Sequence, residues 1–490
     1  MKVLLVAIIL LTSIGTSADA NVAEPTPDFK TRWESVQRLV QLGELQQAVA
    51  ETKALIPHFP KPQEGYNFLG VLYEMLKKPK QAEAAYLRAL EIEPGSMKTR
   101  VNLGTLYAAQ DRFDLVFSYL NPVMKSIQDN PDACFALIRA SLFLQKQEVA
   151  QEAVKALKTE TVKEGSLSLA LGSLLQQYEL HEQAIPYYQH AAHLLPDDYR
   201  PFYGLGISYF QLRAYRQAEE NTSTALRMNP QLVQALTLLG KIALEEGNLE
   251  EARRWLSESL SKNGENDHAL FLLATIRMKE TNYLEARRCL EKGIAINPNI
   301  PEYYFSLITT YHEIQDYRGA LELARQTLQR FQDNPDAFFN VAIELTFLNE
   351  FEQAKEHFRK TIEVFQKYPG PKYMQTLIAA KYKLAHVLLR DGPGYEEASR
   401  LLKEVVEIDP NYMDAYLDLA RINIRQRVYL SACHLLERAI ALNPRNAGAH
   451  YLMARTLSLA GNETEAEREY KKFNALRVSS SGNPQLELVD

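Results

Sequence analysis

Apolar and polar positions alternate along this chain with the spacing of amphipathic helices, most clearly between Arg200 and Pro230. Phe202, Leu205 and Tyr209 are three and four residues apart, which predicts a helix with one apolar face. A second run with similar spacing follows: Ala218, Thr222 and Ala225. Pro230 ends that helix because proline has no backbone N–H. The stretch therefore predicts a helical hairpin, which cannot bury its apolar face alone and needs a copy on each side.

Small residues recur every 34 residues through most of the chain. Stepping from Ala218 by this interval meets nine alanines in ten positions: Ala48, Ala82, Val116, Ala150, Ala184, Ala218, Ala252, Ala286, Ala320 and Ala354. The next step, to Ala398, is 44 residues long, and the interval then returns at Ala432 and Ala466. Glycines recur at the same interval or twice that interval, and a glycine lets two helix axes approach closely: Gly70, Gly104, Gly172, Gly206 and Gly240. These markers predict thirteen hairpins.

Within one period the marker residues follow a fixed order. Leu69-Gly70 is followed by Tyr73, Ala82, Tyr86 and Pro94, and Leu171-Gly172 by Ala184, Tyr188 and Pro196. This order resembles the tetratricopeptide repeat (TPR) family, whose pattern is L-G-x-x-Y, A-x-x-x-F and P at a period of about 34. The resemblance implies an all-α fold, a right-handed superhelical solenoid of about 13 helix-turn-helix repeats over residues 29–478. An irregular helical bundle is the alternative.

Two places depart from the repeat. In the third repeat Val116 replaces the alanine and Pro122 interrupts the second helix, so we expect a kink or an early end there. The ten extra residues before Ala398 lie near 366–376, where they lengthen a loop or the following helix and form a candidate hinge. No break is long enough to separate two domains.

The two ends differ from the repeats in composition. Residues 1–20 combine Lys2, the apolar run Val3–Leu11 and Ala18-Asp19-Ala20, which predicts a cleaved secretory signal and an exported, periplasmic or secreted protein. An uncleaved anchor is the alternative; after cleavage we expect no membrane span. Residues 21–28 predict an extended linker, and residues 479–490 a disordered tail, unless Leu486–Val489 dock on a neighbour or partner.

The chain lacks the local signatures of catalysis. It contains no phosphate-binding loop, no H-E-x-x-H and no G-x-S-x-G, so we expect neither an enzyme nor a cofactor. Cys134, Cys289 and Cys433 lie in distant repeats and predict buried, reduced thiols. His190 and His193 have no thiolate or carboxylate beside them, so no metal site is predicted. A net charge of −6 gives no reason to expect nucleic acid.

The resemblance to the TPR family places ligands on the concave face, which is lined by the first helix of each repeat. It therefore implies a partner-binding groove along an aromatic and hydroxyl-rich stripe: Tyr203, Phe210, Thr237, Lys241, Phe271, Thr275, Phe305, His312 and Phe339. Co-chaperone members of the family grip a terminal carboxylate with a lysine at the repeat position of Tyr203 and an asparagine one turn later, at the repeat position of Lys241. From Asn67 to Ile343 neither residue occurs at its position in this chain. Alternatively, several of these rings pack between hairpins and never reach solvent.

These features predict a non-enzymatic scaffold of the cell envelope or secretory space that binds a partner protein or peptide in its groove. The alternative is a TPR scaffold of an exopolysaccharide synthesis or export machine, or of another envelope secretion machine. That alternative rests on analogy of fold alone.

Overall fold

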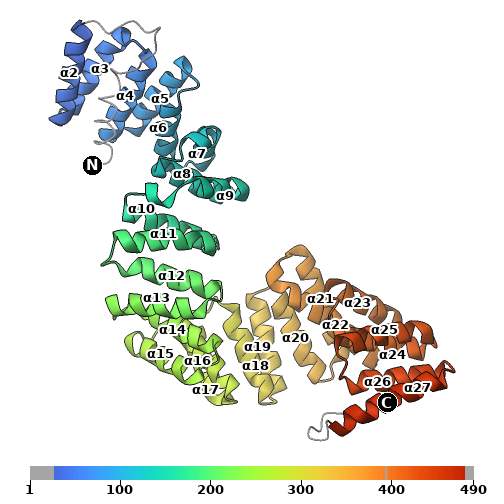
Figure 1. The fold of residues 1–490 in the computed structure, drawn as a ribbon. Coiled ribbons are helices and arrows are strands. Elements are labelled where there is room, and N and C mark those ends of the chain that lie inside the picture. Colours follow the sequence, from blue (N-terminus) through green and yellow to red (C-terminus); the bar gives the residue numbers. More distant parts are fainter. Residues whose placement is uncertain (1–26, 392–393, 480–490) are drawn as a thin grey trace. The chain divides into compact units, whose positions relative to one another are not determined.

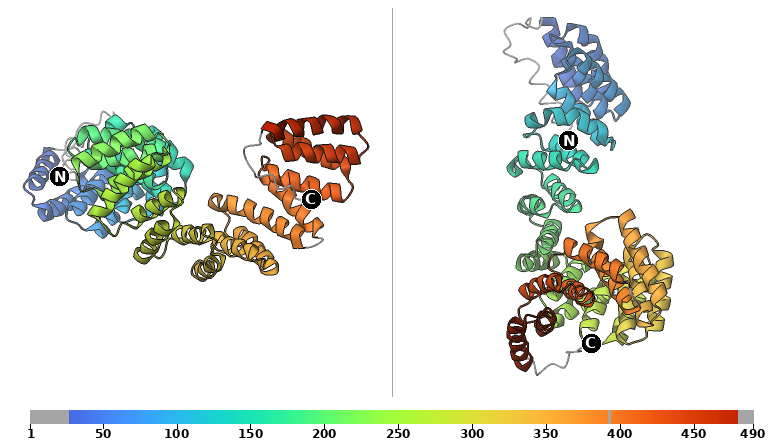
Figure 2. Two further views of the ribbon diagram at one scale, coloured as in Figure 1. Left: turned by 90° about the horizontal axis from the view of Figure 1, so that it is seen from below. Right: turned by 90° about the vertical axis from the view of Figure 1, so that its right-hand side faces the viewer.

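The computed structural model describes residues 27–391 and 394–479. This part of the chain contains helices and no strand, and its 26 α-helices, α2 to α27, follow one another in tandem (Figure 1). Twenty-six is the number that thirteen hairpins require, so the predicted all-α repeat architecture is confirmed. The chain divides between Gly247 and Asn248 into two compact units, whose helices are seen from two further sides in Figure 2.

The first unit contains six hairpins and one further helix. The first helix of each hairpin contacts the second, and the first helices also contact one another from hairpin to hairpin, as α10 does with α12. We call the first helices inner and the second helices outer. The α-helices of this unit are α2 (Pro27–Gln41), α3 (Leu45–Leu55), α4 (Pro62–Met75), α5 (Pro79–Ile92), α6 (Met97–Ala108), α7 (Phe113–Leu120), α8 (Pro131–Phe143), α9 (Gln147–Ala156), α10 (Gly165–Gln177), α11 (His181–Leu194), α12 (Tyr199–Gln211), α13 (Tyr215–Met228) and α14 (Val233–Glu245).

The second unit begins with one helix, α15, which six hairpins follow. Its inner helices likewise contact one another, as α18 does with α20 and α24 with α26. The α-helices of this unit are α15 (Leu249–Lys262), α16 (Asp267–Lys279), α17 (Tyr283–Ile296), α18 (Pro301–Glu313), α19 (Tyr317–Arg330), α20 (Pro335–Phe347), α21 (Phe351–Lys367), α22 (Met374–Asp391), α23 (Tyr395–Ile408), α24 (Met413–Arg425), α25 (Tyr429–Leu442), α26 (Ala447–Leu459) and α27 (Glu463–Ser479).

The structure confirms the register of the repeat. All thirteen marker positions are buried: twelve have no exposed area, and Ala466 has 1%. Most of the turns between an inner and an outer helix contain a residue with positive φ at the same repeat position, from Gly43 (φ 76°) to Gly461 (φ 85°). Non-glycine residues hold nine of these positions, Lys77 and Thr281 among them, although the left-handed region is costly for them.

The glycine column makes room for a particular side chain of the outer helix. A Cβ added at Gly70 would lie 2.3 Å from the ring of Tyr86, and one added at Gly104 would lie 2.5 Å from Leu120. Each partner follows its glycine by 16 residues. Where the inner helix carries the large Ile308 instead, the residue 16 positions later is Ala324, and both are buried. A small residue on the inner helix is thus paired with a large one on the outer helix, or the reverse, and the space between the helices is filled in both cases.

The third repeat departs from the pattern as expected. Its outer helix α7 ends after eight residues at Leu120 and continues as the 3₁₀ helix η2 (Asn121–Ser126), which has Pro122 in its first turn. Proline lacks the N–H that would bond to the carbonyl four residues earlier, so the α-helix stops there.

Other boundaries differ from the expected ones. The last two residues of the expected linker, 21–28, belong to α2, because proline suits the first turn of a helix and Pro27 begins one. The extra residues near 366–376 give a 17-residue α21, the 3₁₀ helix η4 (Pro371–Tyr373) and an 18-residue α22. The boundary between the compact units lies between Gly247 and Asn248, and the hinge near 366–376 stays a prediction. The expected signal, 1–20, and the expected tail beyond Ser479 lie outside the described residues.

Candidate functional site

A groove of about 450 Å³ opens between the inner helices α10 and α12 of the first unit. Its walls come from residues at matching repeat positions of the two helices: Ser166 and Arg200, Leu169 and Tyr203, Ala170 and Gly204, Ser173 and Ile207. Gln176 and Tyr188 complete the lining. Apolar side chains with hydroxyl groups between them suit a segment of polypeptide better than they suit a reaction centre.

Two residues that lie under the groove fix the distance between its walls. The Gln176 amide donates hydrogen bonds to the Gly204 carbonyl and the Ser208 hydroxyl, both at 2.9 Å. The side-chain oxygen of Gln176 accepts a hydrogen bond from the Tyr188 hydroxyl at 3.1 Å. Burial raises the pKa of Tyr188, which keeps this phenol protonated as a donor. The floor is therefore a satisfied polar network and leaves the walls for a ligand.

The walls carry little net charge. Arg200 is 61% exposed and donates to both carboxylate oxygens of Asp198, with its Nε 2.9 Å from each. This hydrogen bonding holds the pKa of Asp198 below its usual range. On the opposite helix Ser166 and Ser173 are exposed. Burial raises the pKa of Tyr203, so its hydroxyl stays neutral.

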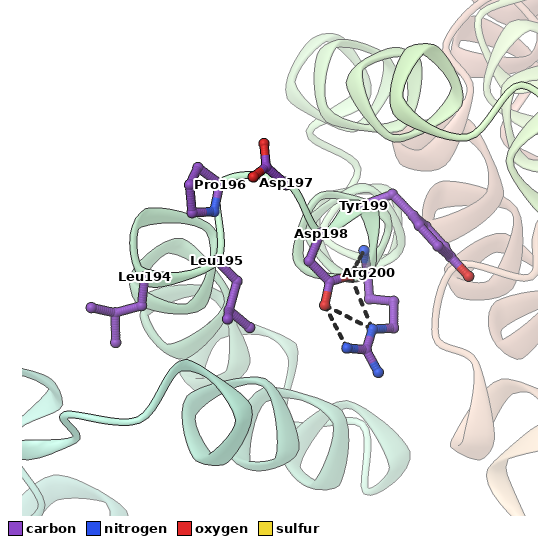
Figure 3. Close-up of a pocket in the computed structure, with 7 residues that line it drawn as sticks. All are labelled: Leu194, Leu195, Pro196, Asp197, Asp198, Tyr199 and Arg200. Carbon is purple, nitrogen blue, oxygen red and sulfur yellow. Dashed lines mark hydrogen bonds and ion pairs between the residues drawn. The ribbon is translucent and has the colours of Figure 1, made fainter.

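Arg200 also borders a second hollow of about 770 Å³, formed by the connection from α11 to α12. Figure 3 shows Asp198 and Arg200 joined by hydrogen bonds, whereas Leu194, Asp197 and Tyr199 point in different directions. Polar groups do not converge there on a common point. The hollow therefore lacks the arrangement of a catalytic centre.

The predicted stripe divides between half-buried and buried positions in the first unit. Tyr203 lines the groove. Phe210 and Thr237 are only 9% and 7% exposed, so they offer little area to a partner. Lys241 lies with its Nζ 4.8 Å from the centre of the Phe210 ring and covers it as a cation–π partner. Phe210 thus packs inside the repeats, as the alternative interpretation of the stripe expects, whereas Tyr203 borders the groove.

In the second unit the predicted residues are half-buried. The Phe271 ring stacks on Tyr303 at 5.0 Å, and the Thr275 hydroxyl donates to the Phe271 carbonyl at 3.1 Å. Phe305 and Phe339 pack against the hydrophobic core.

His312 is the one predicted residue of this unit that binds a buried acid. Its Nδ1 lies 3.0 Å from Glu344, which is 2% exposed. Burial raises the pKa of that carboxyl. The pair joins α18 to α20.

The cysteines and histidines form no recognisable reactive site. All three thiols are free; Cys134 is buried, and Cys289 and Cys433 are half-buried. His190 contacts the Val162 carbonyl at 2.9 Å. Within residues 27–391 and 394–479, no three histidine, cysteine or acidic side chains gather as metal ligands would. No helix of the same residues is long and apolar enough to cross a membrane.

Of the ten residues that line the groove, the predicted stripe contains only Tyr203. Gln176 precedes Phe210 by one period, and extending that predicted column by one repeat would have found it. Ser166 and Arg200 are likewise one period apart, at the start of their helices. The repeat register relates each of these residues to a position one repeat away, but the stripe was chosen for aromatic and hydroxyl groups and began at Tyr203, so it did not include them.

Comparisons with known families and proteins agree with the repeat. Family models described as tetratricopeptide repeat match residues 63–96, 203–268, 243–309 and 435–468. A BBSome complex member from Xenopus tropicalis is 27% identical over 28% of this chain and 27% of its own length. A TPR repeat-containing protein from Methanocaldococcus jannaschii is 28% identical over 38% of this chain and 34% of its own length. The chain thus spans about a third or less of these relatives.

Two solved structures are similar at low sequence identity. Yeast Tom70 is 17% identical over 90% of this chain and 96% of its own, with a TM-score of 0.44. The APC/C hetero-tetramer Cut9–Hcn1 contains a chain that is 17% identical over 87% of this chain and 83% of its own, also with a TM-score of 0.44.

Proposed function

Since this chain is a member of the tetratricopeptide repeat family, a scaffold fold typical of protein–protein interaction, we propose that it is a non-enzymatic scaffold that binds a peptide segment of a partner protein. The groove between α10 and α12 is the proposed binding site.

The observation that carries this proposal is the lining of that groove. Leu169, Tyr203 and Ile207 offer apolar area, and the Ser173 hydroxyl and the Arg200 guanidinium add polar groups to the lining. An extended or helical peptide matches this surface because apolar anchors supply affinity while a few polar groups fix its orientation. The fixed distance between the two walls adds to affinity, since a preorganised site loses little entropy on binding.

We further propose that the protein acts outside the cytoplasm. The support is the sequence of residues 1–20, with its apolar run Val3–Leu11 and the small residues Ala18 and Ala20. Fractionation of cells that express the full chain tests this part. We expect the exported fraction to contain a protein that begins at Asn21, and an uncleaved protein in the cytoplasm would contradict it.

Site-specific photocrosslinking tests the groove itself. A photoreactive amino acid at Ser173, on the groove margin, should capture one partner in vivo, and the same group at Gln189, exposed on outer helix α11, should not. Ile207→Glu places a charge in the apolar wall and should abolish capture from position 173 while helicity is retained. Equal capture from both positions, or capture that survives Ile207→Glu, would overturn the proposal.

A further inference from the structure

We propose a second binding surface, on the inner helices of the last three hairpins, that binds an acidic segment of a partner protein. Five exposed cationic residues form it: Lys383, Arg390, Arg421, Arg425 and Arg455. We call these five residues the basic row. It lies within the second unit and does not depend on the groove between α10 and α12.

The repeat places these cations on one face. Lys383 and Arg390 belong to α22, Arg421 and Arg425 to α24, and Arg455 to α26. Arg421 and Arg455 are 34 residues apart and hold the same position in successive repeats. The inner helices α24 and α26 are in contact, so Arg421 and Arg455 are neighbours on the inner face. Lys383 and Arg390 precede the marker Ala398 by 15 and 8 residues, as Tyr203 and Phe210 of the predicted stripe precede Ala218. The stripe that the sequence predicts ends at Phe339 and does not reach this part of the chain.

The chain's own acids leave most of this charge uncompensated. Arg421 bonds to the buried Asp418 at 2.7 Å. In the described part of the chain, Lys383, Arg390, Arg425 and Arg455 form no ion pair, although outer-helix arginines do: Arg287 with Glu291, Arg288 with Glu285, and Arg359 with Glu397. Isolated surface cations are ordinarily just solvated. Several on one face of consecutive repeats create a positive potential that attracts a negative partner.

Two of the arginines are already held in place by aromatic rings. The Arg425 guanidinium donates to the Tyr395 hydroxyl at 3.1 Å. The Arg390 guanidinium lies 5.0 Å from the centre of the Phe351 ring and 3.4 Å from the Asn349 side-chain oxygen. Each uses a residue near the start of the preceding outer helix, and neither partner is charged. A guanidinium fixed in this way keeps donors for a carboxylate and loses less entropy when it binds one.

The chemistry favours carboxylates of a polypeptide over the phosphates of a nucleic acid. The chain as a whole carries a net charge of −6 and has a pI of about 6.0, whereas nucleic-acid binders are strongly basic over the binding domain. The row is also short, with one or two cations per repeat. Arginines at this spacing can form paired hydrogen bonds with successive Asp or Glu side chains of a bound segment.

Fluorescence anisotropy with the mature full-length chain tests the proposal. The probe is a labelled peptide of glutamate, serine and leucine, and its counterpart has glutamine in place of every glutamate. Lys383→Glu/Arg455→Glu should weaken binding of the acidic peptide about tenfold or more, because attraction becomes repulsion at two sites. The matched control, Lys403→Glu/Arg438→Glu, makes the same charge change at exposed positions of α23 and α25 and should leave affinity within about twofold.

Circular dichroism and the urea midpoint establish that both double variants are folded. We expect the glutamine peptide not to bind and the affinity of the acidic peptide to fall as salt rises. The proposal is overturned if the acidic peptide fails to bind, if both double variants weaken it equally, or if a single-stranded oligonucleotide binds the row as tightly as the peptide does.

Discussion

The ring of Tyr188 lies between glycines of two successive inner helices, which makes Gly204→Ala a direct test of how the repeats pack. A Cβ added at Gly204 would lie 2.4 Å from two ring atoms of Tyr188. On the other side, a Cβ at Gly172 would lie 2.8 Å from the same ring. Tyr188 is only 2% exposed and is hydrogen-bonded to Gln176, so it has little freedom to retreat.

Two opposing terms decide the effect of Gly204→Ala. Alanine is favoured over glycine inside a helix by about 1 kcal/mol. An ordinary contact needs at least 3.4 Å, so a ring at 2.4 Å must move by roughly an ångström within a closely packed site. Overpacking of this kind costs about 1–3 kcal/mol and occasionally more. We therefore expect Gly204→Ala to destabilise the first unit by about 1–2 kcal/mol.

Urea unfolding followed by circular dichroism measures the change, and hydrogen exchange of α10–α12 assigns it to this site, since a repeat protein need not unfold in one step. Gly293→Ala is the matched control: its Cβ would lie 3.6 Å from Tyr303, an ordinary contact, so only the helix-propensity gain of about 1 kcal/mol should remain. In a Tyr188→Leu background Gly204→Ala should become stabilising, because the ring atoms that it would meet are gone. The reasoning fails if Gly204→Ala raises the midpoint of the parent chain or has the same effect in both backgrounds.

Three further predictions concern other features of the repeat. Thr281 has a φ of 58°, so Thr281→Gly should relieve left-handed strain and raise the free energy of unfolding by about 1 kcal/mol, seen as a higher urea midpoint; a lower midpoint would contradict this. Burial raises the pKa of the Cys134 thiol to about 12, so a maleimide should modify Cys433 in the native protein and reach Cys134 only in urea; equal labelling would show that Cys134 is accessible. Burial also raises the pKa of Glu344, so the folded state binds this proton more tightly than the unfolded state does. The resulting contribution to the free energy of unfolding is present at acid pH and is lost as pH rises through the folded-state pKa. Glu344→Gln should therefore stabilise the protein near about pH 8 and lose this advantage near about pH 4, and a gain that is the same at both pH values would mean that the carboxylate is not the cause.

The sequence alone predicts the repeated part of this structure. Marker positions such as Ala218 are buried in every hairpin, and twelve of the thirteen are alanine because a small side chain lets the two helices approach closely, so the constraint recurs each time. Pro122 predicts the early end of α7 for an equally local reason. Prediction fails at Pro27, where the same residue type begins a helix, because proline is compatible with a first turn as well as with a break.

The groove required information that no single repeat contains. Tyr203 belongs to the predicted stripe, yet the groove that it lines is also bordered by Tyr188, whose ring fits between two hairpins because Gly172 and Gly204 leave space for it. Phe210, chosen by the same reasoning, is 9% exposed and covered by Lys241. The register shows which residues share a face. How far each side chain reaches solvent depends on neighbours one period away, and their sizes vary from repeat to repeat.

This division between repeated and varied positions explains where binding can evolve in such a chain. Positions that hold the hairpin together, such as Ala184 and its equivalents, vary little: twelve of the thirteen are alanine, and Val116 is the exception. Residues on the inner face do change: Ser173 and Ile207 hold the same repeat position as Arg421 and Arg455. One column therefore presents hydroxyl and apolar groups in the first unit and guanidinium groups in the second. If both proposed surfaces are correct, Ile207→Glu should abolish capture in the groove and Lys383→Glu/Arg455→Glu should weaken binding of the acidic peptide, each leaving the other interaction intact. Impairment of both interactions in either variant would mean that the two surfaces are not independent.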